Sequence, residues 1–263
     1  MIGRIRSFFA LLMVAAATIV LAPVQWCALY FGFPRPSLVP SLWHRLALRA
    51  LGLRIHVTGR MTSHRPLLIA ANHISWTDIV ALGAAAEVSF IAKSELAGWP
   101  VAGWLARMQQ TVFVERERKR KSGVQASEVG RRLCRGDVIV LFAEGSTSDG
   151  NTLMPFKSTL FGAAKMAIEE GATDRVFVQP LAIAYTRFHG MPIQRLHMRR
   201  AAWIGDADLV PHVAALLKEG AMDVELRFGE PVEVTASTNR KHLSLQVEAE
   251  VRRLHAEAVR KPA

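Results

Sequence analysis

Apolar positions recur along the chain with two different periods, and their order predicts an α/β fold. Short apolar or alternating runs predict strands at residues 53–59, 66–71, 88–93, 111–115, 138–143, 176–185 and 222–229. Helical spacing between them predicts helices at residues 77–86, 100–108, 120–135, 158–170, 207–218 and 239–259. This alternation predicts a mostly parallel sheet flanked by helices, with the chemistry in loops at the carboxyl ends of the strands.

A longer apolar run precedes the first predicted strand. Residues 7–30 contain no charged side chain, and this length suffices to cross a hydrocarbon core of about 30 Å. A cleaved signal peptide is an alternative, but no clear cleavage site ends the run. We therefore expect residues 1–52 to form a membrane anchor, with an apolar helical segment at 7–33 and an amphipathic helix at 41–52. Residues 53–263 would form the second domain.

The charges around this run bear on how it meets the membrane. Arg4 and Arg6 precede it, and Arg35 and Arg45 are the first basic residues after it. A single crossing would therefore place basic residues on both sides of the bilayer, against the usual cytoplasmic bias. Pro23 also interrupts the run, and proline kinks or ends a helix. The pattern favours a helical hairpin that enters one leaflet over a single span.

The first candidate for chemistry is the segment 71–78, which reads ANHISWTD and follows a predicted buried strand. His73 and Asp78 are about 500° apart on a continuous helix and would lie on different faces. They can meet only if a turn separates them, with Asp78 in the first helical turn. The carboxylate would then hold one imidazole nitrogen protonated and leave the other as a general base. Ser75 and Asp78 also fit a helix-capping box, which is the structural alternative for Asp78.

A second candidate follows the strand predicted at 138–143. The segment 142–151 reads FAEGSTSDGN, and its Glu144, Gly145 and Ser146 open a loop rich in small polar residues. Backbone N–H groups of such a loop can bind an anion or a polar head group. Taken alone, the segment is typical of an ordinary turn between a strand and a loop.

Together these segments resemble the glycerolipid acyltransferase family, typified by bacterial lysophosphatidic acid acyltransferases. The matches appear in the family's order across about residues 40–235. The first block is matched by Asn72, His73 and Asp78, and the second by Lys93, Glu95, Leu96 and the stretch 112–116. The third block is matched by Phe142, Glu144, Gly145, Ser146 and Ser148, and the fourth by Pro180 after residues 176–179.

The resemblance implies a function and a set of roles. The enzyme would move a fatty acyl group from a thioester, on acyl carrier protein or coenzyme A, to the hydroxyl of a lysolipid. His73 would be the general base and Asp78 its orienting partner. Acceptor-binding positions would be Glu144, Gly145, Ser146 and Thr147, and the cations near anionic groups would be Lys93, Arg116 and Lys157. The resemblance implies no covalent acyl-enzyme, no metal and no cofactor.

Two departures from the family pattern bear on the acceptor. The proline of the third block is Ala143, and the arginine that normally follows Gly-Thr is Thr147. An arginine there would bind a phosphate bidentately, and threonine cannot supply that charge. The segments 144–164, 178–192 and 203–212 instead resemble the branch that acylates lyso-ornithine lipid, an acceptor without phosphate. The alternative is a 1-acyl-sn-glycerol-3-phosphate acyltransferase in which Lys157 serves the phosphate.

Overall charge and cysteine content narrow the partners. Lys and Arg outnumber Asp and Glu by 33 to 22, for a net charge of +11, which favours an anionic partner. The basic tract 115–121 and Arg131, Arg132 and Arg135 are expected to contact an anionic membrane or an acidic acyl carrier protein. No aromatic-basic pattern indicates nucleic acid. The two cysteines, Cys27 and Cys134, are too far apart in the sequence to form a metal-ligand or redox motif.

These observations leave two competing functions and one expected location. A membrane-anchored hydrolase could use the same His73 and Asp78, but the sequence offers no clear set of metal ligands. A basic peripheral protein that only organises lipid would not need His73. For the acyltransferase, the resemblance to bacterial enzymes implies the bacterial inner membrane, and the basic flanks of the anchor predict a catalytic domain on the cytoplasmic side.

Overall fold

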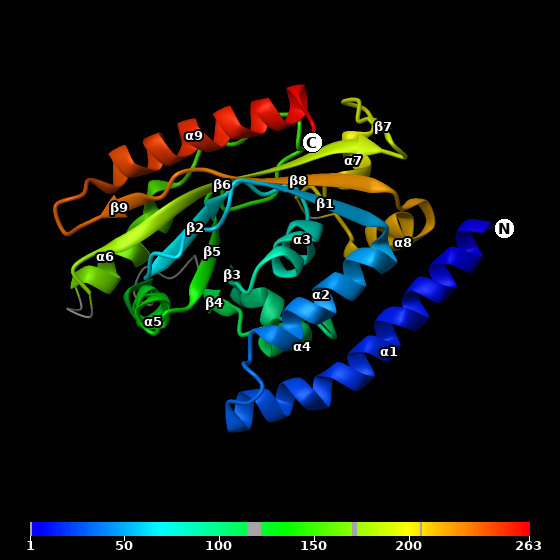
Figure 1. Ribbon diagram of the computed structural model, residues 1–263, viewed down its shortest axis with the longest axis horizontal. Coiled ribbons are helices and arrows are strands. Elements are labelled where there is room, and N and C mark those ends of the chain that lie inside the picture. Colours follow the sequence, from blue (N-terminus) through cyan, green and yellow to red (C-terminus); the bar gives the residue numbers. More distant parts are fainter. Residues whose placement is uncertain (1, 115–121, 170–172, 206) are drawn as a thin grey trace.

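The computed structural model describes residues 2–114, 122–169, 173–205 and 207–263 (Figure 1). Helix α1 spans Ile2–Phe31 and α2 spans Leu38–Leu51. The apolar run does not end its helix at Pro23, because α1 continues through this residue. The chain reverses instead at residues 32–37, where Gly32 has a φ of +72° and Pro34 and Pro36 follow. The resulting hairpin consists of α1 and α2, which pack against each other (Figure 1).

In the described part of the chain, nine strands form one sheet. Its main path is β1–β8–β6–β2–β5–β3–β4, and β7 and β9 pair with β6. The strands are β1 (Leu53–Thr58), β2 (Leu67–Ala71), β3 (Ser89–Lys93), β4 (Val112–Val114), β5 (Val138–Phe142), β6 (Val176–Phe188), β7 (Met191–Pro192), β8 (Met222–Phe228) and β9 (Val232–Val234). β2 is parallel to both β5 and β6, whereas β8 runs antiparallel to β6. The prediction of a mostly parallel sheet flanked by helices is confirmed.

Helices cover both faces of this sheet. They are α3 (Thr77–Ala85), α4 (Ala102–Met108), α5 (Ser122–Cys134), α6 (Gly162–Glu169), α7 (Met198–Ala201), α8 (Leu209–Glu219) and α9 (Arg240–Arg260), with short 3₁₀ turns at Ser94–Gly98 and Ser158–Phe161. α2, α3, α7 and α8 pack on one face, and α5, α6 and α9 on the other (Figure 1). α2 thus shares a core with the domain that follows it.

The central strands show why the sequence adopts this layered fold. All five residues of β2 are buried, with Leu67 and Ile69 in the core beneath α2 and α3 and Leu68 in the core beneath α9. A strand covered on both faces needs such a continuous apolar run. α9 buries the predicted stripe of Leu243, Val247, Val251 and Leu254, and the prediction for this helix is confirmed.

Candidate active site

The end of β2 is fixed by a side chain that continues the sheet. Asn72 follows the strand and is fully buried. Its Nδ2 donates to the carbonyl oxygen of Ile183 at 2.9 Å, and its Oδ1 accepts from the Ile183 N–H at 2.8 Å. Because both bonds go to one residue of β6, the amide acts as one more ladder pair. The backbone that carries the next residue, His73, is therefore held at the carboxyl edge of the sheet.

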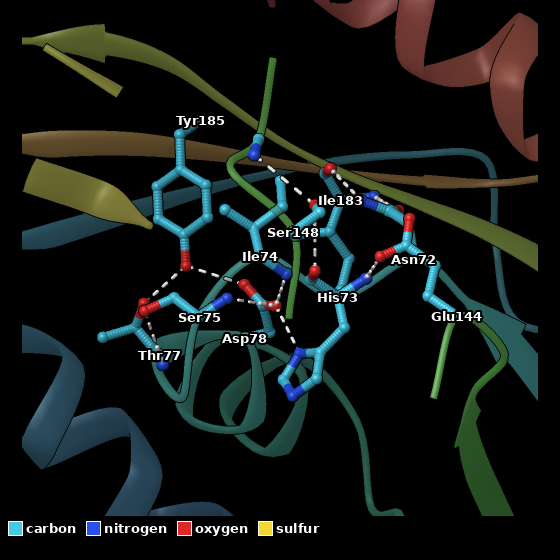
Figure 2. Close-up of polar contacts among 11 residues, drawn as sticks. Asn72, His73, Ile74, Ser75, Thr77, Asp78, Glu144, Ser148, Ile183 and Tyr185 are labelled. Atoms are coloured by element: carbon cyan, nitrogen blue, oxygen red, sulfur yellow. Dashed lines mark hydrogen bonds and ion pairs between the residues drawn. The ribbon is translucent and has the colours of Figure 1, made fainter. Parts of the chain in front are cut away.

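His73 and Asp78 meet as the turn hypothesis requires (Figure 2). β2 ends at Ala71 and α3 begins at Thr77, so a turn separates the two residues and Asp78 lies in the first helical turn. His73 Nδ1 lies 2.8 Å from Asp78 Oδ2, and the carboxylate is fully buried. A carboxylate that accepts N–H bonds requires Nδ1 to carry the proton. The other nitrogen, Nε2, is left with a lone pair and points away from Asp78 (Figure 2).

The same carboxylate also organises the turn. Asp78 Oδ2 accepts the backbone N–H of Ile74 at 2.7 Å and that of Ser75 at 2.9 Å. The bond from Ser75 is the acidic half of the capping box that the sequence suggested. The capping and orienting roles of Asp78 are therefore compatible, since one oxygen serves the turn and the imidazole together.

A tyrosine that the sequence analysis did not single out completes the surroundings of Asp78. Tyr185 in β6 is buried, and its hydroxyl donates to Asp78 Oδ1 at 2.8 Å (Figure 2). The same hydroxyl contacts Thr77 Oγ1. Tyr185 and Asp78 are 107 positions apart in the chain. The one signal in the sequence was that Tyr185 is the last residue of the strand predicted at 176–185, directly after the apolar run 181–184.

The imidazole of His73 rests on an aromatic surface. Its ring stacks on Phe142, the last residue of β5, with centroids 3.8 Å apart and planes inclined by 12°. The His73 side chain keeps 14% of its surface exposed, while Asp78 is closed off from solvent. The ring is thus fixed by stacking on one face and by Asp78 at one edge. Nε2, on the opposite edge from Asp78, is left for a substrate, and this geometry suits a general base.

Glu144 lies in the interior, and its carboxylate faces backbone groups. Its Oε2 accepts the His73 N–H at 3.3 Å and its Oε1 accepts the Met154 N–H at 3.1 Å. Burial raises the pKa of Glu144 to about 8, and the charge of Asp78 adds to this, against the opposing effects of the two N–H donors and Arg252. The side chain therefore connects the His73 turn to the loop after β5. Its predicted role in acceptor binding stays a prediction.

The loop after β5 brings the other predicted acceptor residues to the same edge of the sheet. Gly145 has a φ of +76°, a conformation that favours glycine. Beyond it, Ser146 is exposed and Thr147 is half-buried. Ser148 is buried, and its N–H donates to the carbonyl oxygen of His73 at 2.8 Å. Thr147 thus lies next to a residue that contacts the histidine backbone.

The predicted cations occupy different positions. Lys93 ends β3 and is exposed, at the edge of the sheet that also carries His73. Lys157 is exposed as well, and its backbone N–H donates to Ala143 at 2.9 Å. Arg116 and the basic tract 115–121 lie outside the described residues. No group of three or more possible metal ligands occurs among the described histidine, cysteine, aspartate and glutamate side chains.

Fold and site together define a class of protein: an α/β enzyme with a buried aspartate bonded to a histidine at the carboxyl edge of a mostly parallel sheet. Residues 54–184 match the protein family described as Acyltransferase. The chain belongs to this acyltransferase family and is an O-acyltransferase. The resemblance seen in the sequence motifs is confirmed, and the hydrolase and non-enzymatic alternatives are set aside.

Individual relatives extend over nearly the whole chain. It is 50% identical to the lyso-ornithine lipid O-acyltransferase of Brucella abortus, over 97% of this chain and 95% of that protein. It is 45% identical to the Rhizobium meliloti protein of the same name, over 99% and 89%. The 1-acyl-sn-glycerol-3-phosphate acyltransferase of Neisseria gonorrhoeae is 41% identical over 48% of this chain and 49% of that protein.

A solved structure supports the fold. The 1-acyl-sn-glycerophosphate acyltransferase PlsC of Thermotoga maritima covers 98% of this chain, and the match covers 99% of that one. The TM-score is 0.57 and the sequence identity is 23%. The likeness therefore concerns the arrangement of helices and strands.

Proposed function

We propose that this enzyme transfers a fatty acyl group from a thioester to the hydroxyl of lyso-ornithine lipid. The observation that carries the proposal is the His73–Asp78 pair, whose geometry leaves Nε2 available to accept the proton of an attacking hydroxyl. A lipid hydroxyl is a poor nucleophile, and general base catalysis typically contributes about 10²–10⁴-fold. Asp78 keeps the imidazole in the required tautomer and stabilises the imidazolium that forms.

The choice of acceptor rests on Thr147 and on the relatives. A phosphate monoester near His73 would need a cationic partner, because an unpaired buried charge is costly. Thr147 supplies none, and Lys157 is exposed. The two relatives aligned over nearly the whole chain are named lyso-ornithine lipid O-acyltransferases. Lysophosphatidic acid is the second candidate, with Lys93 and Lys157 as the cations that would serve it.

An acceptor and donor panel tests both parts of the substrate assignment. Purified enzyme would be assayed with lyso-ornithine lipid and with lysophosphatidic acid, each with acyl carrier protein and coenzyme A thioesters of one chain length. We expect a higher kcat/KM for lyso-ornithine lipid. A preference for lysophosphatidic acid would refute the acceptor, while the acyl transfer itself would stand. The two thioesters decide the donor directly, and we expect the acidic carrier protein to be favoured by the excess of basic residues.

We also propose that α1 binds the bacterial inner membrane from its cytoplasmic side. α1 is long and apolar enough to cross a bilayer, and only 6% of its most apolar stretch is buried. Yet Arg6 donates to backbone oxygens at the end of α8, and Gln25 donates to the Met108 oxygen at the end of α4. The stretch of α1 from Arg6 to Gln25, about 28 Å long, therefore lies alongside the domain. This arrangement supports attachment through an exposed side of α1, without a crossing.

Cysteine labelling distinguishes attachment from a crossing. In a Cys27→Ser and Cys134→Ser background, the exposed residues Arg4 and Arg35 would be replaced one at a time by cysteine. A membrane-impermeant reagent should label both positions in inside-out vesicles and neither in right-side-out vesicles. Labelling of the two positions from opposite sides would demonstrate a full crossing and overturn the monotopic arrangement.

A further inference from the structure

The hydroxyl of Tyr185 donates a hydrogen bond to Asp78 Oδ1, whereas His73 bonds to the other carboxylate oxygen, Oδ2. Asp78 Oδ2 accepts three N–H groups, whereas the hydrogen bond described for Oδ1 comes from Tyr185 at 2.8 Å (Figure 2). Both partners are buried, with 1% of Tyr185 and none of Asp78 exposed. A hydrogen bond to a buried carboxylate is among the stronger ones in proteins. The plane of the Asp78 carboxylate is therefore fixed on one side by Tyr185 of β6 and on the other by the backbone of its own turn.

Tyr185 is suited to act as a permanent donor. Burial raises its pKa well above the usual range for tyrosine, and the charge of Asp78 adds to this effect. The phenol therefore keeps its proton at neutral pH. Thr77 Oγ1 contacts the same hydroxyl from α3, so the O–H direction is restricted as well. A register shift in the pairing of β6 with β8 falls between Tyr185 and Arg187, next to this side chain.

We propose that Tyr185 is a positioning residue for acyl transfer, which holds Asp78 in the orientation that keeps His73 a competent base. The inference rests on the general base role proposed for His73. Its hydrogen bond also draws charge density toward Oδ1 and away from the oxygen that faces the imidazole. Loss of the bond would leave the carboxylate plane of Asp78 held only through Oδ2, and would strengthen its attraction for a protonated His73.

Tyr185→Phe removes one oxygen atom and retains the ring. We expect kcat to fall about tenfold, because a hydrogen bond to a charged group is lost, while KM for acceptor and donor stays within about twofold. The acidic limb of the kcat/KM profile should move to higher pH, since Asp78 then stabilises the imidazolium more strongly. A purely structural tyrosine would lower stability and leave this limb in place.

Other titratable groups near the pair remain unchanged in this variant. Glu144 faces His73 and Asp78 from the loop after β5, and Arg252 of α9 faces Glu144. Their contribution to the pH profile is common to the wild type and the variant. The shift between the two profiles therefore reports the bond from Tyr185 to Asp78.

The chain offers a matched control and a coupling test. Its other tyrosine, Tyr30, is 76% exposed on α1, and Tyr30→Phe should leave kcat and the pH profile unchanged. In an Asp78→Asn background, Tyr185→Phe should cost much less than in the wild type, because both changes disrupt one unit. Equal fold losses in the two backgrounds would overturn the proposal.

A spectroscopic measurement tests the proposal without altering Tyr185. Tyr30→Phe leaves Tyr185 as the sole tyrosine, so tyrosine labelled with ¹³C only at the ring Cζ gives one NMR resonance. We expect this resonance to move with the same pH midpoint as the acidic limb, and to lose that transition when Asp78→Asn is added. No pH response, or an unchanged pH profile in Tyr185→Phe, would refute the positioning role. Failure of the proposed function is distinct, because it would appear as normal turnover in His73→Ala.

Discussion

Glu144 provides a test of the buried site that does not depend on the substrate. In the folded protein, burial raises its pKa from an ordinary value of 4.5 to about 8. Between these pH values the folded state keeps the proton and the unfolded state releases it, so stability falls as pH rises through the window. The difference corresponds to a loss of up to about 5 kcal/mol, complete above about pH 8. The side chain is 1% exposed, so solvent screens little of this effect.

Glu144→Gln should remove this pH dependence, because the amide does not ionise. We expect its free energy of unfolding, relative to the wild type, to rise between pH 5 and 8.5 by about 4 kcal/mol, which is most of the full effect. Denaturation of the detergent-solubilised protein at a series of pH values, followed by circular dichroism, measures the difference. Glu230→Gln is the matched control at an exposed position and should run parallel to the wild type. A constant difference between Glu144→Gln and the wild type would show that Glu144 stays ionised in the fold, and would refute the reasoning.

Three further predictions concern catalysis, specificity and the anchor. His73→Ala should lower turnover at least about 10²-fold with folding intact, and Asp78→Asn should be severely impaired through the wrong tautomer; steady-state kinetics and circular dichroism measure both effects. Thr147→Arg should shift the ratio of kcat/KM for the two acceptors toward lysophosphatidic acid by roughly 10–100-fold, and an unchanged ratio would show that this position does not contact the head group. Arg6→Ala should lower stability by about 1–3 kcal/mol, because carbonyl oxygens at the end of α8 lose their donor. The exposed Arg4→Ala is its control, and equal melting temperatures for the two variants would contradict the anchoring contact.

The sequence predicted the sheet well because its central strands are covered on both faces. β2 and β5 are continuous apolar runs, and such runs have few alternatives inside a domain. The short elements β7, β9 and α7 were not predicted. Two to four residues carry too little periodicity to be recognised, and β7 and β9 exist because β6 is long enough to pair with them.

Pro23 lies inside a helix, although proline usually ends one. A proline inside a helix costs about 3 kcal/mol, which made it the apparent point of reversal. The helix nevertheless continues through Pro23, and it is held to the rest of the protein on both sides of this residue: Trp43 of α2 donates to Thr18, and Gln25 donates to the Met108 oxygen. The stronger break signal was the glycine and the prolines at residues 32–36, where one glycine takes a φ of +72° and the chain turns.

Within the candidate site, the sequence identified the reacting pair but not its support. His73 and Asp78 are five residues apart, so a short motif was enough to find them. Tyr185 reaches Asp78 across 107 positions, and Met154 reaches Glu144 through a loop whose path the sequence does not specify. Contacts of this kind depend on which strands become neighbours, and that information appears only when the sheet order is known.

The support of the site also extends beyond the segment that matches the family. That segment ends at residue 184. Helix α9 begins at Arg240, and its side chains bind the loop after β5. Glu248 accepts the Phe156 N–H at 2.7 Å, and Arg252 donates to the Leu153 oxygen at 2.9 Å. Glu248 and Arg252 also form a salt bridge with each other, with 2.9 Å between Arg252 Nε and Glu248 Oε1. Each side chain therefore restrains the position of the other. Because Met154 lies between the two held residues, α9 also fixes the N–H that Glu144 accepts. The placement of the His73 turn therefore depends on a helix that carries none of the motif residues.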